Sequence, residues 1–300
     1  MSSIGTSLFG YDLDSPTILA SGILGATPRG MIPAIEAGAG AVTTKSLGLE
    51  PRKGHPNPCV VEVKGGYLNA MGLPNPGVSA YGKELKQTDF SAPVIGSIYG
   101  HDTDELRKAA EVLQPNVDIL ELNLSCPHAE NLGAAVGSDP QLVEEIVEAV
   151  KGEVGAPVIA KLPPAVPDIA EIGLAAERGG ADGIAAINTL PGMTIDIETR
   201  TPVLGNASGG LSGEAIHPVA VKAVYDLYSA LSVPVIGLGG VAEGSDLVEL
   251  ILAGASAVGI GTAIAKKDLS VFSELNEFLL GYLNSTNSKL TDLIGAAHKG

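Results

Sequence analysis

The chain has only two cysteines, Cys59 and Cys126, among its 300 residues. Two thiols make neither a disulfide framework nor a zinc site, so the sequence predicts no metal centre. No apolar run is long enough to span a bilayer, and the first residues lack a basic segment followed by an apolar one. We therefore expect a cytoplasmic protein with no membrane segment.

Basic residues are scarce as well, since 18 Lys and Arg stand against 34 Asp and Glu and give a formal net charge of -16. An acidic surface repels the phosphates of nucleic acids and anionic lipids, so neither is an expected partner. Hydrophobic residues make up 45% of the chain, which is ample for one large core. We expect residues 1–300 to form a single domain, because no segment has the composition of a linker.

Short apolar runs alternate with longer helical patterns along the chain, which is typical of β-α-β units around a parallel sheet. The helical patterns cover residues 104–113, 140–150, 168–178, 218–230, 245–253 and 269–282, with Ser138, Asp139 and Ser245 as candidate N-caps. The expected strands are residues 17–21, 41–46, 93–98, 119–124, 157–162, 183–188, 234–238 and 257–261.

These eight units predict a closed (β/α)8 TIM barrel, whose active site lies at the carboxyl ends of the strands. An open doubly wound sheet is the alternative, but no Gly-x-Gly-x-x-Gly follows the first strand. We expect residues 6–14 to form a small N-terminal hairpin that closes the barrel floor. Residues 48–81, 127–137 and 190–211 interrupt the alternation, and such insertions usually become walls above the catalytic face.

The last two strands end in glycine-rich turns. Gly239 and Gly240 follow the seventh strand, Gly261 and Thr262 follow the eighth, and residues 209–213 add a third glycine cluster. Glycines let a backbone approach an anion, and the loops after strands seven and eight of a barrel often hold a phosphate. One glycine pair would carry little weight, but three clusters at the exits of consecutive barrel strands predict a phosphate site.

Cys126 comes directly after the apolar strand 119–124, and Pro127 stops that strand. A thiol at a strand exit faces the catalytic loops, although a lone cysteine is more often a small buried hydrophobe.

Lys161 stands near the end of strand 157–162. A lysine at such an exit can form a Schiff base or stand as a fixed cation beside a cofactor, whereas a lone lysine usually extends its charged end to water at the rim. Further polar side chains recur at comparable places and are expected to converge: Lys45, Asn69, Asn123, Lys161 and Asn188.

Nearly the whole chain resembles the class 1 dihydroorotate dehydrogenases, which are FMN-dependent barrels that oxidise dihydroorotate to orotate in pyrimidine biosynthesis. The resemblance rests on segments 20–22, 44–46, 68–77, 123–127, 160–162, 187–189 and 196–213. Segments 68–77 and 200–213 look closest to class 1B, the NAD-linked subgroup. That resemblance implies a homodimer joined to an FAD and [2Fe-2S] electron-transfer subunit in a heterotetramer.

The resemblance also implies a role for each matching residue. Cys126 would be the base that takes a proton from C5 of dihydroorotate while a hydride leaves C6 for N5 of FMN. The substrate would be held by Lys45, Asn69, Met71, Gly72, Leu73, Asn123, Asn188 and Thr189. FMN, with Lys161 at its N1/O2 edge, would contact Ala20, Ser21, Gly22, Lys45, Ser46, Ser97, Asn123, Lys161, Ile187, Gly213, Gly239, Gly240, Gly261 and Thr262.

Two positions depart from the family pattern, because His128 and Ser97 stand where asparagine is usual. Ser97 keeps a hydroxyl, which is compatible with flavin binding. The Cys-Pro-His segment also resembles the pyrimidine-binding domain of dihydropyrimidine dehydrogenase, so an FMN barrel acting on uracil is an alternative, although segment 68–77 favours dihydroorotate. More remote alternatives are a Schiff-base aldolase using Lys161 and a non-catalytic flavoprotein that docks a redox partner. We interpret Cys59 as incidental.

Overall fold

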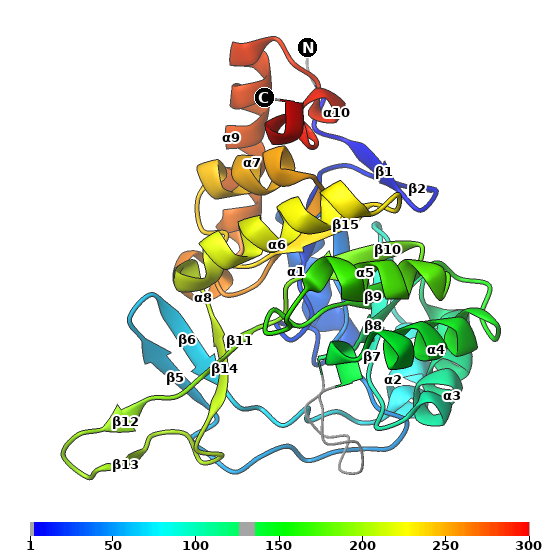
Figure 1. Cartoon of the computed structure of the whole chain (residues 1–300), viewed down its shortest axis with the longest axis vertical. Helices are drawn as coiled ribbons and strands as arrows, with labels where there is room; N and C mark the ends of the chain where they lie inside the picture. The colour runs from blue at the N-terminus through cyan, green and yellow to red at the C-terminus, as the bar shows by residue number, and fades with distance from the viewer. Residues whose placement is uncertain (1–2, 126–135, 300) are drawn as a thin grey trace.

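The computed structural model describes residues 3–125 and 136–299, and at its centre lies a closed barrel of parallel strands (Figure 1). Within these residues each barrel strand pairs with the one before it in the chain, and the last pairs with the first. The predicted TIM barrel is therefore confirmed. Its strands are β3 (Thr17–Leu19), β4 (Ala41–Thr43), β7 (Val94–Ile98), β8 (Ile119–Asn123), β9 (Val158–Lys161), β10 (Gly183–Ala186), β15 (Val235–Leu238) and β16 (Ala255–Ile260).

Helices cover the outside of the barrel, and every predicted helix is present with small shifts at its ends. Asp139 caps α4, because its carboxylate accepts hydrogen bonds from the next two free backbone N–H groups. Ser245 is not an N-cap, since α7 starts one residue earlier and Glu243 and Asp246 form its capping box. The helices are α1 (Ile32–Glu36), α2 (Val78–Leu85), α3 (Thr103–Leu113), α4 (Pro140–Lys151), α5 (Ile169–Arg178), α6 (His217–Ala230), α7 (Gly244–Ala253), α8 (Ile264–Lys267), α9 (Ser270–Thr286) and α10 (Leu290–Leu293).

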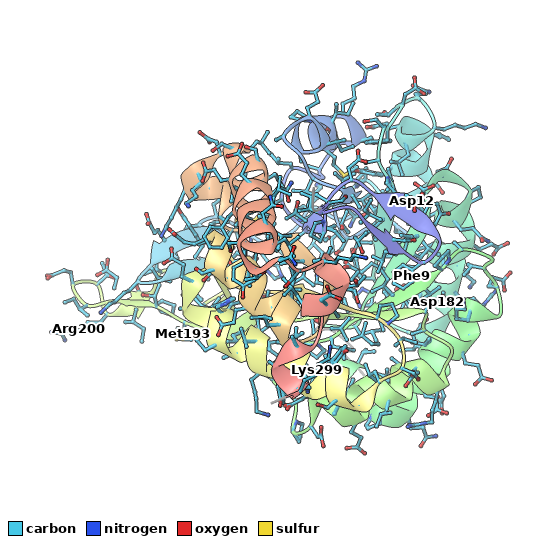
Figure 2. The ribbon with its side chains drawn as sticks, turned by 90° about the horizontal axis from the view of Figure 1, so that it is seen from above. Phe9, Asp12, Asp182, Met193, Arg200 and Lys299 are labelled. Carbon is cyan, nitrogen blue, oxygen red and sulfur yellow. The ribbon has the colours of Figure 1, made fainter. Side chains whose placement is uncertain are left out.

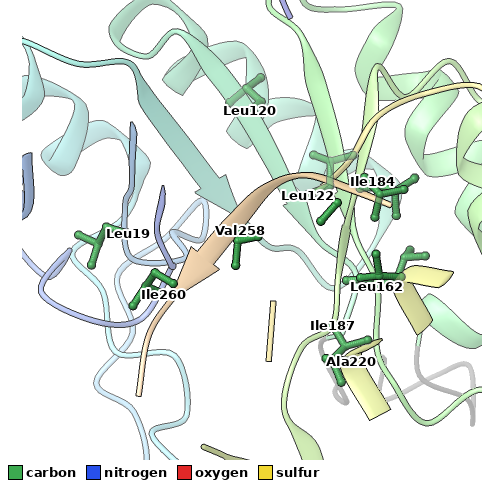
Figure 3. Close-up of a cluster of buried hydrophobic side chains, with 14 of the residues drawn as sticks. Leu19, Leu120, Leu122, Leu162, Ile184, Ile187, Ala220, Val258 and Ile260 are labelled. Atoms are coloured by element: carbon green, nitrogen blue, oxygen red, sulfur yellow. The ribbon is translucent and has the colours of Figure 1, made fainter. Parts of the chain in front are cut away.

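The outward-facing side chains of the barrel strands form the main core with the helices. Leu120 and Leu122 on β8 and Val258 and Ile260 on β16 are buried in this layer (Figure 3). Successive residues of a strand alternate between its two faces, so Glu121, between Leu120 and Leu122, and Gly259, between Val258 and Ile260, face the inside of the barrel. In the described chain, no helix is long and apolar enough to cross a membrane.

The barrel interior is apolar at one end and polar at the other. The apolar layer contains Ile18, Ile95, Ile119, Ile159 and Ile236, and it also contains two leucines of the N-terminal hairpin β1 (Thr6–Leu8) and β2 (Tyr11–Leu13). The predicted hairpin is thus confirmed, and it closes the amino-terminal end of the barrel. Two residues further along β7, β8 and β9, the inward positions carry polar groups instead: Ser97, Glu121 and Lys161.

Two of the three insertions meet in one antiparallel sheet beside the barrel. This sheet has the order β11 (Leu190–Gly192), β14 (Gly209–Ser212), β6 (Gly66–Asn69) and β5 (Val60–Val63). The third glycine cluster was predicted to lie at a barrel strand exit, and this is wrong, because Gly209 and Gly210 lie in β14, which pairs with β11 and β6 of the outer sheet. Most of insertion 127–137 lies outside the described residues.

Beyond this sheet, the chain continues into an arm that projects from the body of the molecule. The arm carries the short strands β12 (Ile195–Asp196) and β13 (Thr201–Pro202). Met193 and Arg200 lie on it, well away from the hairpin residue Phe9 (Figure 2). Because β11 follows Thr189 directly and β14 leads into Gly213, the arm grows out of the edge of the predicted site.

Candidate active site

A chain of hydroxyl groups joins the exits of three neighbouring strands. Ser46 Oγ lies 3.2 Å from Ser21 Oγ and 2.9 Å from Ser97 Oγ. Ser21 Oγ also donates to the carbonyl of Thr44 at 2.8 Å, which fixes the loop after β3 against β4. The structure therefore brings together three residues that the sequence assigns to cofactor binding, and hydrogen bonds hold their side chains against one another.

Two amide side chains extend this chain around the barrel mouth. Asn123 Nδ2 donates to Ser46 Oγ at 3.2 Å, and Asn188 Nδ2 donates to Asn123 Oδ1 at the same distance. The backbone N–H of Ser125 also donates to Asn123 Oδ1. Asn123 therefore contacts Ser46, which is predicted to bind the cofactor, and Asn188, which is predicted to bind the substrate. Because each amide orientation is fixed by its partners, the free donors and acceptors point in set directions.

Asn69, which is predicted to bind the substrate, approaches the exit of β10 from the outer sheet. Asn69 Nδ2 donates to the carbonyl of Gly210 at 3.3 Å, and Asn69 pairs with Gly210 in the β6–β14 register. The side chain of Thr189 packs against Gly210, where a Cβ would collide with it. Glycine at position 210 thus serves close packing between Asn69 and Thr189, which explains why this cluster is a strand and not an anion-binding turn.

Lys45 is buried at the exit of β4, and its backbone N–H donates to the carbonyl of Gly25 at 3.0 Å. Burial lowers the pKa of Lys45 from its ordinary value, and the nearby Cys59 thiol offsets part of that effect. The acceptor Gly25 carbonyl is also bound by the phenol of Tyr81 at 2.7 Å. Tyr81 on α2 therefore supports the backbone of Lys45 from behind.

Lys161 does not snorkel at the rim, because its side chain is only 7% exposed. Its Nζ lies 3.6 Å from Oε2 of Glu121, whose side chain is equally enclosed. Both residues point into the barrel from adjacent strands, directly above the apolar layer. The structure thus places a buried ion pair beneath the hydroxyl and amide groups of the site.

The glycine turns after β15 and β16 leave adjacent strands at the same level, since the register pairs Leu238 with Gly259. Gly239 and Gly240 both have positive φ values, 138° and 70°, and a Cβ at Gly240 would lie 2.6 Å from Cβ of His217. Gly261 differs, because its φ is not positive and its Cβ would make only ordinary contacts at 3.7 Å with Ala20 and Ile23. The fold requires glycine at 240, whereas nothing in the protein's own packing requires it at 261.

The two cysteines have different outcomes. Cys126 lies outside the described residues, as does His128, so the geometry of the predicted base stays a prediction. Strand β8 ends at the barrel mouth with Asn123, which precedes Cys126 by three residues in the sequence. Cys59 is not remote from the site, since its thiol lies 3.5 Å from Sδ of Met71 and its carbonyl accepts from Ala70.

The sequence interpretation missed three residues that shape the site. Glu121 pairs with Lys161, Tyr81 supports the loop of Lys45, and His217 lies between the turn after β15 and α7, with Nδ1 2.9 Å from the carbonyl of Gly239. An acidic residue on an otherwise apolar strand, two positions before Asn123, was a usable signal for Glu121. Contacts of Tyr81 and His217 join residues far apart in the chain, which no local pattern indicates.

A parallel barrel with a buried ion pair, a hydroxyl and amide network and glycine turns at its carboxyl end defines an enzyme of the (β/α)8-barrel class. The model of the family described as dihydroorotate dehydrogenase matches residues 3–283. Similar proteins include the catalytic subunits named dihydroorotate dehydrogenase B (NAD(+)) from Pyrococcus horikoshii and from Methanosarcina mazei. The first is 50% identical and covers 97% of each chain, and the second is 51% identical and covers 98% of this chain and 95% of its own.

The corresponding subunit of Methanocaldococcus jannaschii is 46% identical and covers 98% of both chains. The chain thus belongs to the dihydroorotate dehydrogenase family of oxidoreductases, and within it to class 1B.

Proposed function

We propose that this chain oxidises dihydroorotate to orotate with bound FMN and passes the electrons through a partner subunit to NAD(+). The observation that carries the proposal is the continuous network from Ser21 through Ser46 and Asn123 to Asn188, at the catalytic end of a barrel of this family. It links residues assigned to the cofactor with residues assigned to the substrate.

The residues at the mouth fit FMN on two counts. Gly261 has no structural reason to be glycine, and a phosphate approaching the backbone of its turn supplies one. Lys161 also has donors to offer to the polar edge of a flavin. Among the described residues its Nζ donates no hydrogen bond, and its contact with Glu121 is electrostatic. FMN, when bound, would supply a hydride acceptor. We propose that FMN contacts the residues that the family resemblance implies: Ala20, Ser21, Gly22, Lys45, Ser46, Ser97, Asn123, Lys161, Ile187, Gly213, Gly239, Gly240, Gly261 and Thr262.

For the substrate, Lys45 would bind the carboxylate, and Asn69, Asn123 and Asn188 would hold the ring amides. These side chains come from β6, β8 and the exits of β4 and β10, so they would contact a flat ring from several sides. Donors that are already fixed by hydrogen bonds cost little reorganisation as negative charge develops during proton loss. Cys126 would take the proton from C5, helped by nearby cations that favour its thiolate.

The ion pair of Lys161 argues against a Schiff-base aldolase. A Schiff-base lysine must reach the carbonyl of its substrate, whereas Nζ of Lys161 is held by its attraction to the Glu121 carboxylate at 3.6 Å. The uracil alternative rests on His128, which lies outside the described residues. We retain dihydroorotate, because segment 68–77 matches the orotate-binding pattern of the family, and Asn69 donates to Gly210, which packs against Thr189.

The partners follow from the family type. The relatives are named catalytic subunits, which implies a separate second subunit. We propose that this subunit carries FAD and a [2Fe-2S] cluster, and that two copies of each chain form a heterotetramer around a homodimer of this one. The cytoplasmic location stays a prediction from the sequence.

The proposal is tested on the complex purified from native cells, with orotate formation followed in the presence of NAD(+). We expect orotate from dihydroorotate, one NADH per orotate, and no comparable oxidation of dihydrouracil. Preference for dihydrouracil would overturn the substrate assignment. If the isolated chain forms orotate at the same rate with NAD(+) as the only acceptor, the proposal of a second subunit that passes electrons to NAD(+) is wrong.

A further inference from the structure

We propose that Glu121 is a positioning residue that holds the ammonium group of Lys161 in place at the cofactor site. The inference rests on the proposed function, because it assumes that FMN binds beside Lys161. Glu121 would touch neither the flavin nor the substrate. Its effect would pass entirely through the ammonium group of Lys161.

The surroundings of Glu121 leave Lys161 as its charge partner. Glu121 is 4% exposed, and its register neighbours are Ser97 on β7 and Ile159 on β9. Below it lies the apolar layer that contains Ile119. Among the described residues its Oε1 atom has no hydrogen-bond partner, and Oε2 faces Lys161 Nζ at 3.6 Å. The negative charge of this carboxylate is therefore balanced across a single contact.

Such a pair is a poor stabiliser of the fold. Taking both charges out of water costs about as much as their attraction returns, and apolar residues of similar size would serve the core as well. The layer immediately below shows that this barrel fills its interior with isoleucine where no polar group is required. The placement of the pair at the boundary between the apolar layer and the site therefore points to a role in the site.

That role follows from the two ends of the Lys161 side chain. Lysine has a long flexible stem, and a buried ammonium group tends to move toward water. A carboxylate below it opposes this movement, since the attraction between the two groups fixes the position of the positive charge. The distance of 3.6 Å exceeds that of a hydrogen bond, so the N–H groups of Lys161 remain available to an acceptor on a bound ligand.

The test is a double-mutant cycle on the FMN-loaded protein with Glu121→Gln, Lys161→Met and the double variant. Two readouts besides turnover are measured: the affinity of flavin for sulfite and the midpoint potential of the flavin. Both report positive charge near the flavin ring. Glu144→Gln is the matched control, since it removes the same charge from an exposed pair with Arg178.

We expect Glu121→Gln to weaken sulfite binding roughly tenfold, as typical for coupled residues in contact, and to lower the potential by about 30 mV for a two-electron couple. In the Lys161→Met background the same change should neither weaken sulfite binding nor lower the potential. Equal effects in both backgrounds, tighter sulfite binding or no change would overturn the proposal. Failure of the wild-type chain to bind FMN would instead overturn the proposed function.

If Glu121→Gln does not yield folded, FMN-loaded protein, Glu121→Asp gives a second reading. Aspartate keeps the charge but is one methylene shorter, so the contact with Lys161 lengthens. Sulfite affinity between those of wild type and Lys161→Met supports the positioning role. Affinity equal to wild type contradicts it.

Discussion

Gly261→Ala tests whether the turn after β16 holds a ligand or only closes the fold. The backbone at Gly261 is not in the left-handed region, and the new methyl would meet only Ala20 and Ile23 at 3.7 Å. Alanine also restricts the unfolded chain, so the free energy of unfolding of the cofactor-free protein should rise by about 0.4–1 kcal/mol. Packing alone therefore predicts a neutral or stabilising substitution.

Cofactor binding should respond in the opposite direction. A methyl on this turn would push a phosphate away from the backbone, and a hydrogen bond to a charged group is worth about 1.5–3 kcal/mol. FMN should then bind about 10- to 150-fold more weakly. Urea unfolding measures the first quantity, and quenching of flavin fluorescence during titration measures the second.

Two further glycines make the comparison sharper. Gly281→Ala on the exposed face of α9 has nothing within 4 Å and should gain up to about 1 kcal/mol without changing FMN affinity. Gly240→Ala should lose both stability and FMN, because φ is 70° and the methyl would lie 2.6 Å from His217. If Gly261→Ala binds FMN as tightly as wild type, the phosphate site does not include this turn.

Three other substitutions give separate tests. Cys126→Ala should keep FMN but slow its reduction by dihydroorotate by about 10²–10⁴-fold, whereas Cys59→Ala should retain the wild-type rate; equal rates for the two variants in stopped-flow would exclude Cys126 as the base. Burial lowers the pKa of Lys45, so the affinity for orotate should fall as the pH rises through that lowered value. The Lys45→Gln variant should bind orotate weakly at every pH. The same pH dependence in the variant and in wild type would contradict the role of the ammonium group. Tyr81→Phe removes the 2.7 Å hydrogen bond to the carbonyl of Gly25, which keeps its bond from the N–H of Lys45, and should lower the free energy of unfolding in urea by about 0.5–1.5 kcal/mol; an unchanged free energy of unfolding would contradict the support that Tyr81 gives to this loop.

The sequence predicted the barrel well because its evidence is local and periodic. Each buried parallel strand is a short apolar run, and each helix has its own amphipathic pattern and cap, so β8 and α4 are visible without knowledge of the fold. The ends of the strands were placed too late at Ser21 and Asn188, because the polar exit residues continue the run in the sequence but leave the hydrogen-bonded ladder.

The site was predictable where its residues follow a strand and was missed where they meet across the molecule. Asn123 and Asn188 stand at strand exits, and the structure joins them. The outer sheet was not foreseen, since pairing of Asn69 with Gly210 connects segments 141 residues apart. Segment 209–213 resembled an anion-binding turn because glycine serves close strand packing and phosphate binding alike.

The most direct test of the account is the anaerobic mixing of dihydroorotate with the FMN-loaded chain, without its partner subunit. The account predicts that the yellow colour bleaches in a single turnover and that one orotate forms for each flavin reduced. A flavin that stays oxidised in the presence of saturating dihydroorotate would contradict the central claim, whatever the fate of the partner subunit.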